Sequence, residues 1–165
     1  MGRMRIGILS DSHNHLERTR AAVRILVEAR AETLIHCGDL ATPEIVVACA
    51  VRPFYFVFGN HDGASAPHLE AAARAAGATC LGWGGVIELA GKRIGVIHGH
   101  LATDRKRIEA ERPEYLLSGH THAALDWMDG PTRRINPGAL FRASEFSVAL
   151  LDLGTGSLQF LPVPR

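Results

Sequence analysis

The chain has 165 residues, of which 47% are hydrophobic and 21% are charged. This length suits one domain with its own apolar core, and the composition excludes a disordered chain. The formal net charge of +1 argues against nucleic acid or an anionic membrane as a bulk partner. We expect residues 1–165 to form a single domain.

Cysteine usage and hydropathy indicate a reducing compartment. The three cysteines, Cys37, Cys49 and Cys80, are widely spaced and odd in number, so no disulfide framework is expected. No apolar run approaches the roughly 18 residues of a membrane span, and the N-terminal apolar stretch is too short for a signal peptide. We therefore expect a cytoplasmic protein with reduced thiols and no membrane partner.

The first half of the sequence alternates strand and helix signals. Three apolar runs predict buried strands, at residues 5–9, 33–37 and 54–58. Apolar residues at helical spacing from Ala22 to Ala29 predict a helix, and Thr42 followed by Pro43 has the pattern of a second helix start. The alanine-rich stretch Leu69–Ala76 predicts a third helix that ends at Gly77.

From about Thr79 the pattern changes to short strands with few helices. Residues 86–89 and 93–97 predict a hairpin, and a helix is expected over residues 105–112 before Pro113. Further strands are expected at residues 115–117, 125–128, 147–153 and 158–161. Helix-linked strands followed by a meander favour an α/β fold with two packed sheets flanked by helices.

Side chains that can bind metal ions follow the apolar runs within a few residues. They are Asp11, His13, Asp39, Asn60, His61, His98, His100, His120 and His122. Ligands in α/β sheets bind beyond the carboxyl ends of strands, where a rigid backbone can fix a coordination shell. Each residue taken singly suits a structural role equally well, since a lone histidine often lies in a core and asparagine is common in turns. The ordered set predicts one metal-binding cleft.

The set reads Asp-x-His, Gly-Asp, Gly-Asn-His-Asp, His-Gly-His and Gly-His-Thr-His, and it resembles the calcineurin-like metallophosphoesterases. The likeness runs from Met4 to about Ser144 and is strongest to the small, single-domain bacterial and archaeal phosphodiesterase branch, which is similar in size to the retromer subunit of the same fold. It implies a four-layer αββα sandwich of two mixed sheets. It also implies a dinuclear metal-dependent phosphoesterase, phosphodiesterase rather than phosphomonoesterase, in which a metal-bridging hydroxide hydrolyses a small phosphate ester.

The resemblance also implies a role for each residue of the set. Asp11, His13 and His122 would bind the first metal ion, and Asn60, His98 and His120 the second. Asp39 would bridge both ions. His61 would be catalytic, by stabilising the transition state or protonating the leaving oxygen. The roles of His100, as an outer-shell or substrate-facing residue, and of Asp62, as a partner of His61 or a turn residue, stay open.

Imidazole, carboxylate and amide ligands without thiolate favour two divalent transition-metal ions over calcium or magnesium. The resemblance puts manganese first, and nickel, cobalt, iron or zinc are alternatives. Two departures from the family pattern touch no predicted ligand. Ala139 follows Ile135-Asn136-Pro137-Gly138, a loop after a strand where the family commonly has a small hydroxyl residue next, and no second carboxylate follows Gly38-Asp39.

The main alternative is a non-catalytic metal-binding scaffold for protein partners, like the retromer subunit. Such scaffolds lack the catalytic histidine, whereas His61 is present here. A nuclease subunit would need a larger chain and a basic groove, and Arg105-Lys106-Arg107 suits a solvated helix face better, so a nucleic acid polymer is not expected as partner. The physiological substrate is not encoded in a readable motif, and a homo-oligomer stays open.

Overall fold

The computed structural model describes residues 3–165, so Met1 and Gly2 of the predicted domain lie outside the described residues. The strands are β1 (Arg5–Leu9), β2 (Thr33–His36), β3 (Phe54–Phe56), β4 (Thr79–Cys80), β5 (Gly84–Leu89), β6 (Lys92–Ile97), β7 (Tyr115–Leu117), β8 (Ala124–Asp129), β9 (Thr132–Pro137), β10 (Phe146–Asp152) and β11 (Leu158–Val163). The helices are α1 (Leu16–Glu28), α2 (Pro43–Cys49), α3 (Ala66–Ala76) and α4 (Ala102–Glu109), and a 3-10 turn spans Gly63–Ser65.

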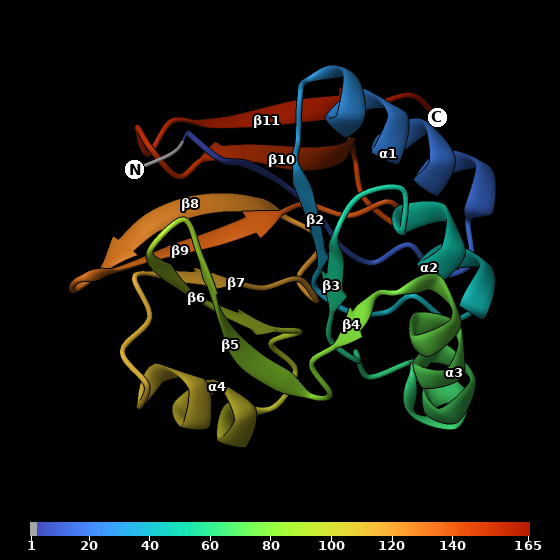
Figure 1. Ribbon diagram of the computed structural model, residues 1–165, viewed down its shortest axis with the longest axis horizontal. Helices are drawn as coiled ribbons and strands as arrows, with labels where there is room; N and C mark the ends of the chain where they lie inside the picture. Colours follow the sequence, from blue (N-terminus) through green and yellow to red (C-terminus); the bar gives the residue numbers. More distant parts are fainter. Residues whose placement is uncertain (1–2) are drawn as a thin grey trace.

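The first sheet has the strand order β11-β10-β1-β2-β3-β4 and carries α1, α2 and α3 on its outer face (Figure 1). Strands β1, β2, β3 and β4 are parallel neighbours, and β10 pairs antiparallel with β1. Leu26 of α1, Leu69 of α3 and Phe56 of β3 lie in one buried cluster between these helices and the sheet. Burial on both faces explains why the parallel strands read as continuous apolar runs.

The second sheet, with the order β5-β6-β7-β9-β8, packs against the first. Ile8 and Ile35 from the first sheet share a buried cluster with Val96 and Leu117 from the second. Helix α4 covers part of the outer face of the second sheet through the buried Ile108. The result is helix, sheet, sheet, helix, which confirms the predicted four-layer αββα architecture.

The C-terminal half differs from the predicted meander. Strand β7 pairs in parallel with both β6 and β9, and β10 and β11 return to the first sheet. The segment 135–138 was expected to be a loop. Instead, Ile135, Asn136 and Pro137 form the end of strand β9, and only Gly138 lies beyond the strand. Thr132, Arg133 and Arg134 give that strand a polar start, which hides the apolar signal of its buried end.

Some helix boundaries also differ from the predicted ones. Helix α4 begins three residues earlier than expected and ends at Glu109. Thr42 does occupy the residue before α2, but its hydroxyl donates to Asn14 Oδ1 at 2.9 Å instead of capping the helix. Gly77 ends α3 with a left-handed φ of +70°, as predicted. None of the helices within residues 3–165 is both long and apolar enough to cross a bilayer.

Candidate metal centre

Two turns at the carboxyl ends of β1 and β2 carry the predicted aspartates. Asp11 has a φ of +55° and Asp39 a φ of +61°, in the left-handed region that residues other than glycine rarely adopt. The backbone N–H of Asp11 donates to Gly38 O, and that of His13 donates to Asp39 O, both at 3.0 Å. The pairing of β1 with β2 therefore continues into the turns and brings both carboxylates to one edge.

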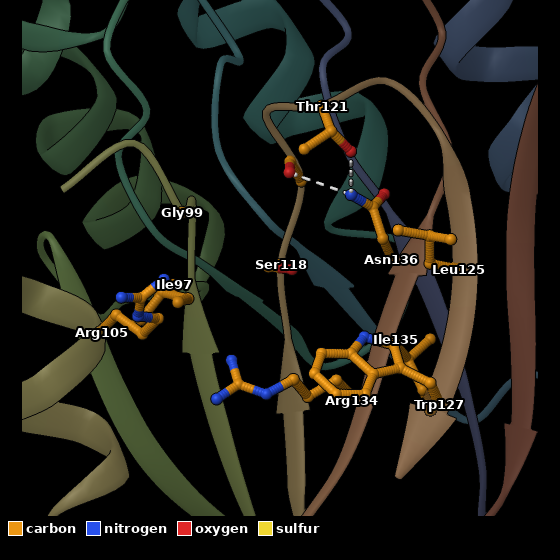
Figure 2. A pocket seen from close by; sticks show the side chains of 11 residues that line it. Ile97, Gly99, Arg105, Ser118, Thr121, Leu125, Trp127, Arg134, Ile135 and Asn136 are labelled. Carbon is orange, nitrogen blue, oxygen red and sulfur yellow. Dashed lines mark hydrogen bonds between the residues drawn. The ribbon is translucent and has the colours of Figure 1, made fainter. Parts of the chain in front are cut away.

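The second sheet supplies the histidines that follow β6 and β7. The backbone N–H of Gly119 donates to His98 O at 3.0 Å, which ties the two strand ends together. Below this loop, the buried Asn136 amide donates to Gly119 O and Thr121 Oγ1, both at 3.0 Å, as the dashed lines in Figure 2 show. The end of β9 thus holds the loop from which His120 and His122 project.

Three imidazole nitrogens approach the two carboxylates. His13 Nε2 lies 3.3 Å and His98 Nε2 3.2 Å from Asp39 Oδ2. His98 Nε2 is also 2.9 Å from Asn60 Oδ1, and His122 Nε2 is 3.1 Å from Asp11 Oδ1. The structure thus brings together six of the seven predicted metal ligands, Asp11, His13, Asp39, Asn60, His98 and His122.

The seventh, His120, lies at the rim of this cluster. Its backbone N–H donates to Asp11 Oδ2 at 3.1 Å, and its ring centroid is 5.1 Å from that of His98. Within residues 3–165, the His120 side chain belongs to none of the compact groups of metal-binding ligand atoms. The backbone of His120 therefore supports Asp11, while its ring stays beside His98.

Mutual electrostatics determine the protonation of the cluster. Burial raises the pKa of Asp39, but the nearby imidazoles of His13 and His98 outweigh it and hold that pKa well below its usual value. Burial lowers the pKa of His13, whereas the carboxylates of Asp11 and Asp39 raise it to about 9. The same two carboxylates raise the pKa of His98 against the effect of burial. The centre therefore favours ionised carboxylates and positive charge between them.

Two buried atoms of this cluster, Asp11 Oδ1 and His13 Nε2, have no hydrogen-bond partner among residues 3–165. Buried polar atoms normally have one, so each such exception needs an explanation. Ligand atoms within 4.8 Å of one another occur in three overlapping groups, Asp11 with His13 and His122, His13 with Asp39 and His61, and Asp11 with Asp39 and His98. A cation between these atoms would satisfy both orphaned groups, so the donor set fits divalent metal ions.

His61 and Asp62 follow β3 and play different parts. His61 is exposed, and its backbone N–H donates to Asp39 Oδ1 at 2.8 Å. Asp62 is buried and accepts backbone N–H groups of Asp39, Ala41 and Gly59 at 2.8 Å and of Leu40 at 3.3 Å. No hydrogen bond joins Asp62 to the His61 ring in the described chain, so of the two roles left open, the structure favours the turn role.

His100 lies beside His98 and belongs to none of the compact groups of ligand atoms within residues 3–165. Its ring centroid is 5.3 Å from that of His98 and 6.0 Å from that of the half-exposed Trp83. Burial, followed by the charges of His98 and His120, lowers the pKa of His100. Of the two histidines in His98-Gly99-His100, His98 is the one that faces Asp39.

Sequence reasoning missed two residues that shape the centre. The Phe141 ring packs 4.5 Å from that of His13, and no sequence signal marks it. His36 is fully buried at the end of β2, and burial lowers its pKa to about 3. Its position inside the apolar run 33–37 is a sequence signal that could have marked it. A histidine buried in such a run needs hydrogen-bond partners, so a structural role for it is expected.

The helix, sheet, sheet, helix layers are those of the metallophosphoesterase fold, as its structural neighbours confirm. The sequence pattern of the calcineurin-like phosphoesterase superfamily domain matches residues 4–156, so the chain belongs to this superfamily.

Individual relatives agree with this assignment. A phosphodiesterase of Methanocaldococcus jannaschii is 27% identical over 138 residues, which cover 82% of this chain and 83% of that protein. A solved archaeal phosphodiesterase superimposes with a TM-score of 0.87 at 23% identity, over 96% of this chain and 99% of that one. Yfce, a phosphoesterase from E. coli, gives 0.69 at 18% identity, over 98% and 100%. Vps29 from Entamoeba histolytica gives 0.63 at 19% identity, over 98% and 100%.

Replacing Asp62 by asparagine should destabilise the fold. An amide offers one acceptor oxygen where the carboxylate serves four N–H groups, so at least one buried donor loses its partner. We expect Asp62→Asn to lower the free energy of unfolding by about 1–3 kcal/mol in urea denaturation. Glu70→Gln, on the exposed face of α3, is the matched control and should unfold like the wild type. Equal stability of all three proteins would contradict the anchoring role of Asp62.

Proposed function

We propose that the protein is a dinuclear metal-dependent phosphoesterase, with phosphodiesters of small molecules as its preferred substrates. The observation that carries this proposal is the convergence of the Asp11 and Asp39 carboxylates with three imidazole nitrogens. Two buried atoms of this cluster, Asp11 Oδ1 and His13 Nε2, have no hydrogen-bond partner among residues 3–165. Membership of the phosphoesterase superfamily and the similarity to an archaeal phosphodiesterase support the reaction class.

In this proposal each metal ion has ligands from both sheets. Asp11, His13 and His122 would hold the first ion, and Asn60, His98 and His120 would hold the second. Asp39 would contribute to both sites, a role supported by the distances from its Oδ2 to His13 Nε2, 3.3 Å, and to His98 Nε2, 3.2 Å. When bound, such a pair of cations lowers the pKa of water between them and neutralises charge on the phosphoryl oxygens.

Backbone carbonyls orient two of these imidazoles, and a third histidine, His61, is proposed to move the proton. The carbonyl of Arg142, 3.2 Å from His122 Nδ1, directs the other ring nitrogen of His122 toward Asp11. Likewise Cys37 O, 2.7 Å from His98 Nδ1, leaves His98 Nε2 for Asp39 and Asn60. We assign to His61 the role of protonating the leaving oxygen or stabilising charge that develops on it, a role supported by its exposure and its position beside His13 and Asp39.

The chemistry of the donor atoms indicates which metal ions the site would bind. Imidazoles, carboxylates and one amide oxygen suit transition metals, and we propose manganese first, with nickel, cobalt, iron or zinc as alternatives.

The three cysteines, Cys37, Cys49 and Cys80, are unpaired, which fits our proposal of a cytoplasmic location.

One observation favours a second candidate function. Vps29 shares the fold, and a protein of this architecture could hold metal ions as part of a scaffold for protein partners. The presence of His61, exposed beside Asp39, argues for catalysis instead, because scaffolds of this fold lack the catalytic histidine.

Hydrolysis assays on metal-stripped protein test the proposal directly. Manganese, nickel, cobalt, zinc or magnesium is added back singly, with bis(p-nitrophenyl) phosphate and p-nitrophenyl phosphate as substrates. We expect cleavage that returns with transition metals, faster for the diester than for the monoester. Two bound ions without cleavage of either ester would favour the scaffold. Full activity without metal would contradict the mechanism.

His61→Ala should separate catalysis from metal binding. Loss of a proton donor costs roughly 10²–10⁴-fold in turnover, whereas the metal content should stay that of the wild type. His68→Ala, which removes another exposed imidazole from α3, is the control and should keep full turnover. Unchanged turnover of His61→Ala would remove His61 from the mechanism, and loss of bound metal would make it a ligand instead.

A further inference from the structure

A buried imidazole connects the two turns that carry Asp11 and Asp39. His36, the last residue of β2, has no solvent exposure. Its Nδ1 lies 3.1 Å from the backbone nitrogen of Gly38, and its Nε2 lies 2.5 Å from Ser12 Oγ. Ser12 is itself fully buried. One ring therefore contacts both turns from the interior side.

The hydrogen bonds assign the ring proton. A backbone N–H can only donate, so Nδ1 of His36 accepts from Gly38. A neutral imidazole then carries its proton on Nε2, and that N–H donates to Ser12 Oγ. The ring thus accepts from one turn and donates to the other, and neither link can be reversed while the ring stays neutral.

The two contacted residues are neighbours of predicted metal ligands. Ser12 lies between Asp11 and His13, and Gly38 directly precedes Asp39. Asp11, His13 and Asp39 all have left-handed φ values, which are strained and persist only where surrounding contacts enforce them. A shift of either turn would change the spacing between the two carboxylates.

We propose that His36 is a positioning residue for the metal centre, which fixes the Ser12 turn to the Gly38 turn and so sets the separation of Asp11 from Asp39. This inference rests on the proposed function. His36 acts through Ser12 and Gly38 and touches neither metal nor substrate. Outer residues that orient ligands typically contribute 10- to 100-fold to metal affinity, which gives the expected size of the effect.

Two substitutions separate the two links of the ring. The side-chain oxygen of His36→Asn can replace Nδ1 as acceptor for Gly38 but cannot reach Ser12. The amide nitrogen of His36→Gln can replace Nε2 as donor to Ser12 but leaves Gly38 without its acceptor. Ser12→Ala removes one hydroxyl and serves as the milder variant if either His36 variant fails to fold. Ile35→Val, a neighbour on β2 that faces the core between the sheets, is the control.

The readouts are Mn²⁺ affinity, by competition with a chelator, and urea unfolding of the metal-free proteins. We expect both His36 variants and Ser12→Ala to bind Mn²⁺ about 10- to 100-fold more weakly than the wild type. Ser12→Ala should add nothing in the His36→Asn background, where its bond is already lost, but should weaken binding further in His36→Gln. Ile35→Val should lose stability and keep wild-type affinity.

The outcomes distinguish the two proposals. If the wild type binds Mn²⁺ and the His36 and Ser12 variants match its affinity while only their stability falls, His36 is a structural residue and this inference is wrong. If the wild type binds no divalent metal, the proposed function fails, and the positioning role falls with it.

Discussion

The structure depends on keeping two buried carboxylates, Asp11 and Asp39, close to one another. Their ligand atoms and that of His98 lie within 4.8 Å of each other, and both side chains are almost completely buried. Two like charges 4 Å apart repel by about 4 kcal/mol at an effective dielectric constant of 20. The imidazoles of His13, His98 and His122 reduce this repulsion, and bound cations would remove it. The affinity of the site for positive charge thus follows from its own repulsion.

The surrounding architecture supplies the geometry that this repulsion opposes. Parallel pairing of β1 with β2 places both turns at one edge, and the second sheet adds histidines from the opposite side. Glycine is required where the chains approach most closely. A Cβ on Gly59 would lie 2.1 Å from Asp39 Oδ1, and one on Gly119 would lie 2.0 Å from Ser10 Oγ. The glycines of Gly-Asn-His-Asp and Gly-His-Thr-His are therefore part of the centre.

The sequence predicted those features that have a local signal. The apolar runs located β1, β2 and β3, and the order of aspartates and histidines after the runs identified side chains that the fold brings together. The roles of individual ligands remain predictions. Strand β9 was not predicted because its polar first half carries no apolar periodicity. The pairing of β10 with β1 was not predicted because it joins segments that are far apart in the sequence. Asp62 accepts backbone N–H groups of the distant Asp39 turn, and the His36 ring bonds the side chain of Ser12, which follows a different strand. The sequence can mark a buried polar residue, but it does not show which distant partner that residue has.

Anomalous diffraction from crystals of the protein grown with Mn²⁺ tests the dinuclear centre most directly. We expect two anomalous peaks about 3.5–4 Å apart, with the Asp39 carboxylate between them and histidines of both sheets around them. A single peak, or peaks that do not touch the Asp39 carboxylate, would contradict the dinuclear centre on which the proposed function depends.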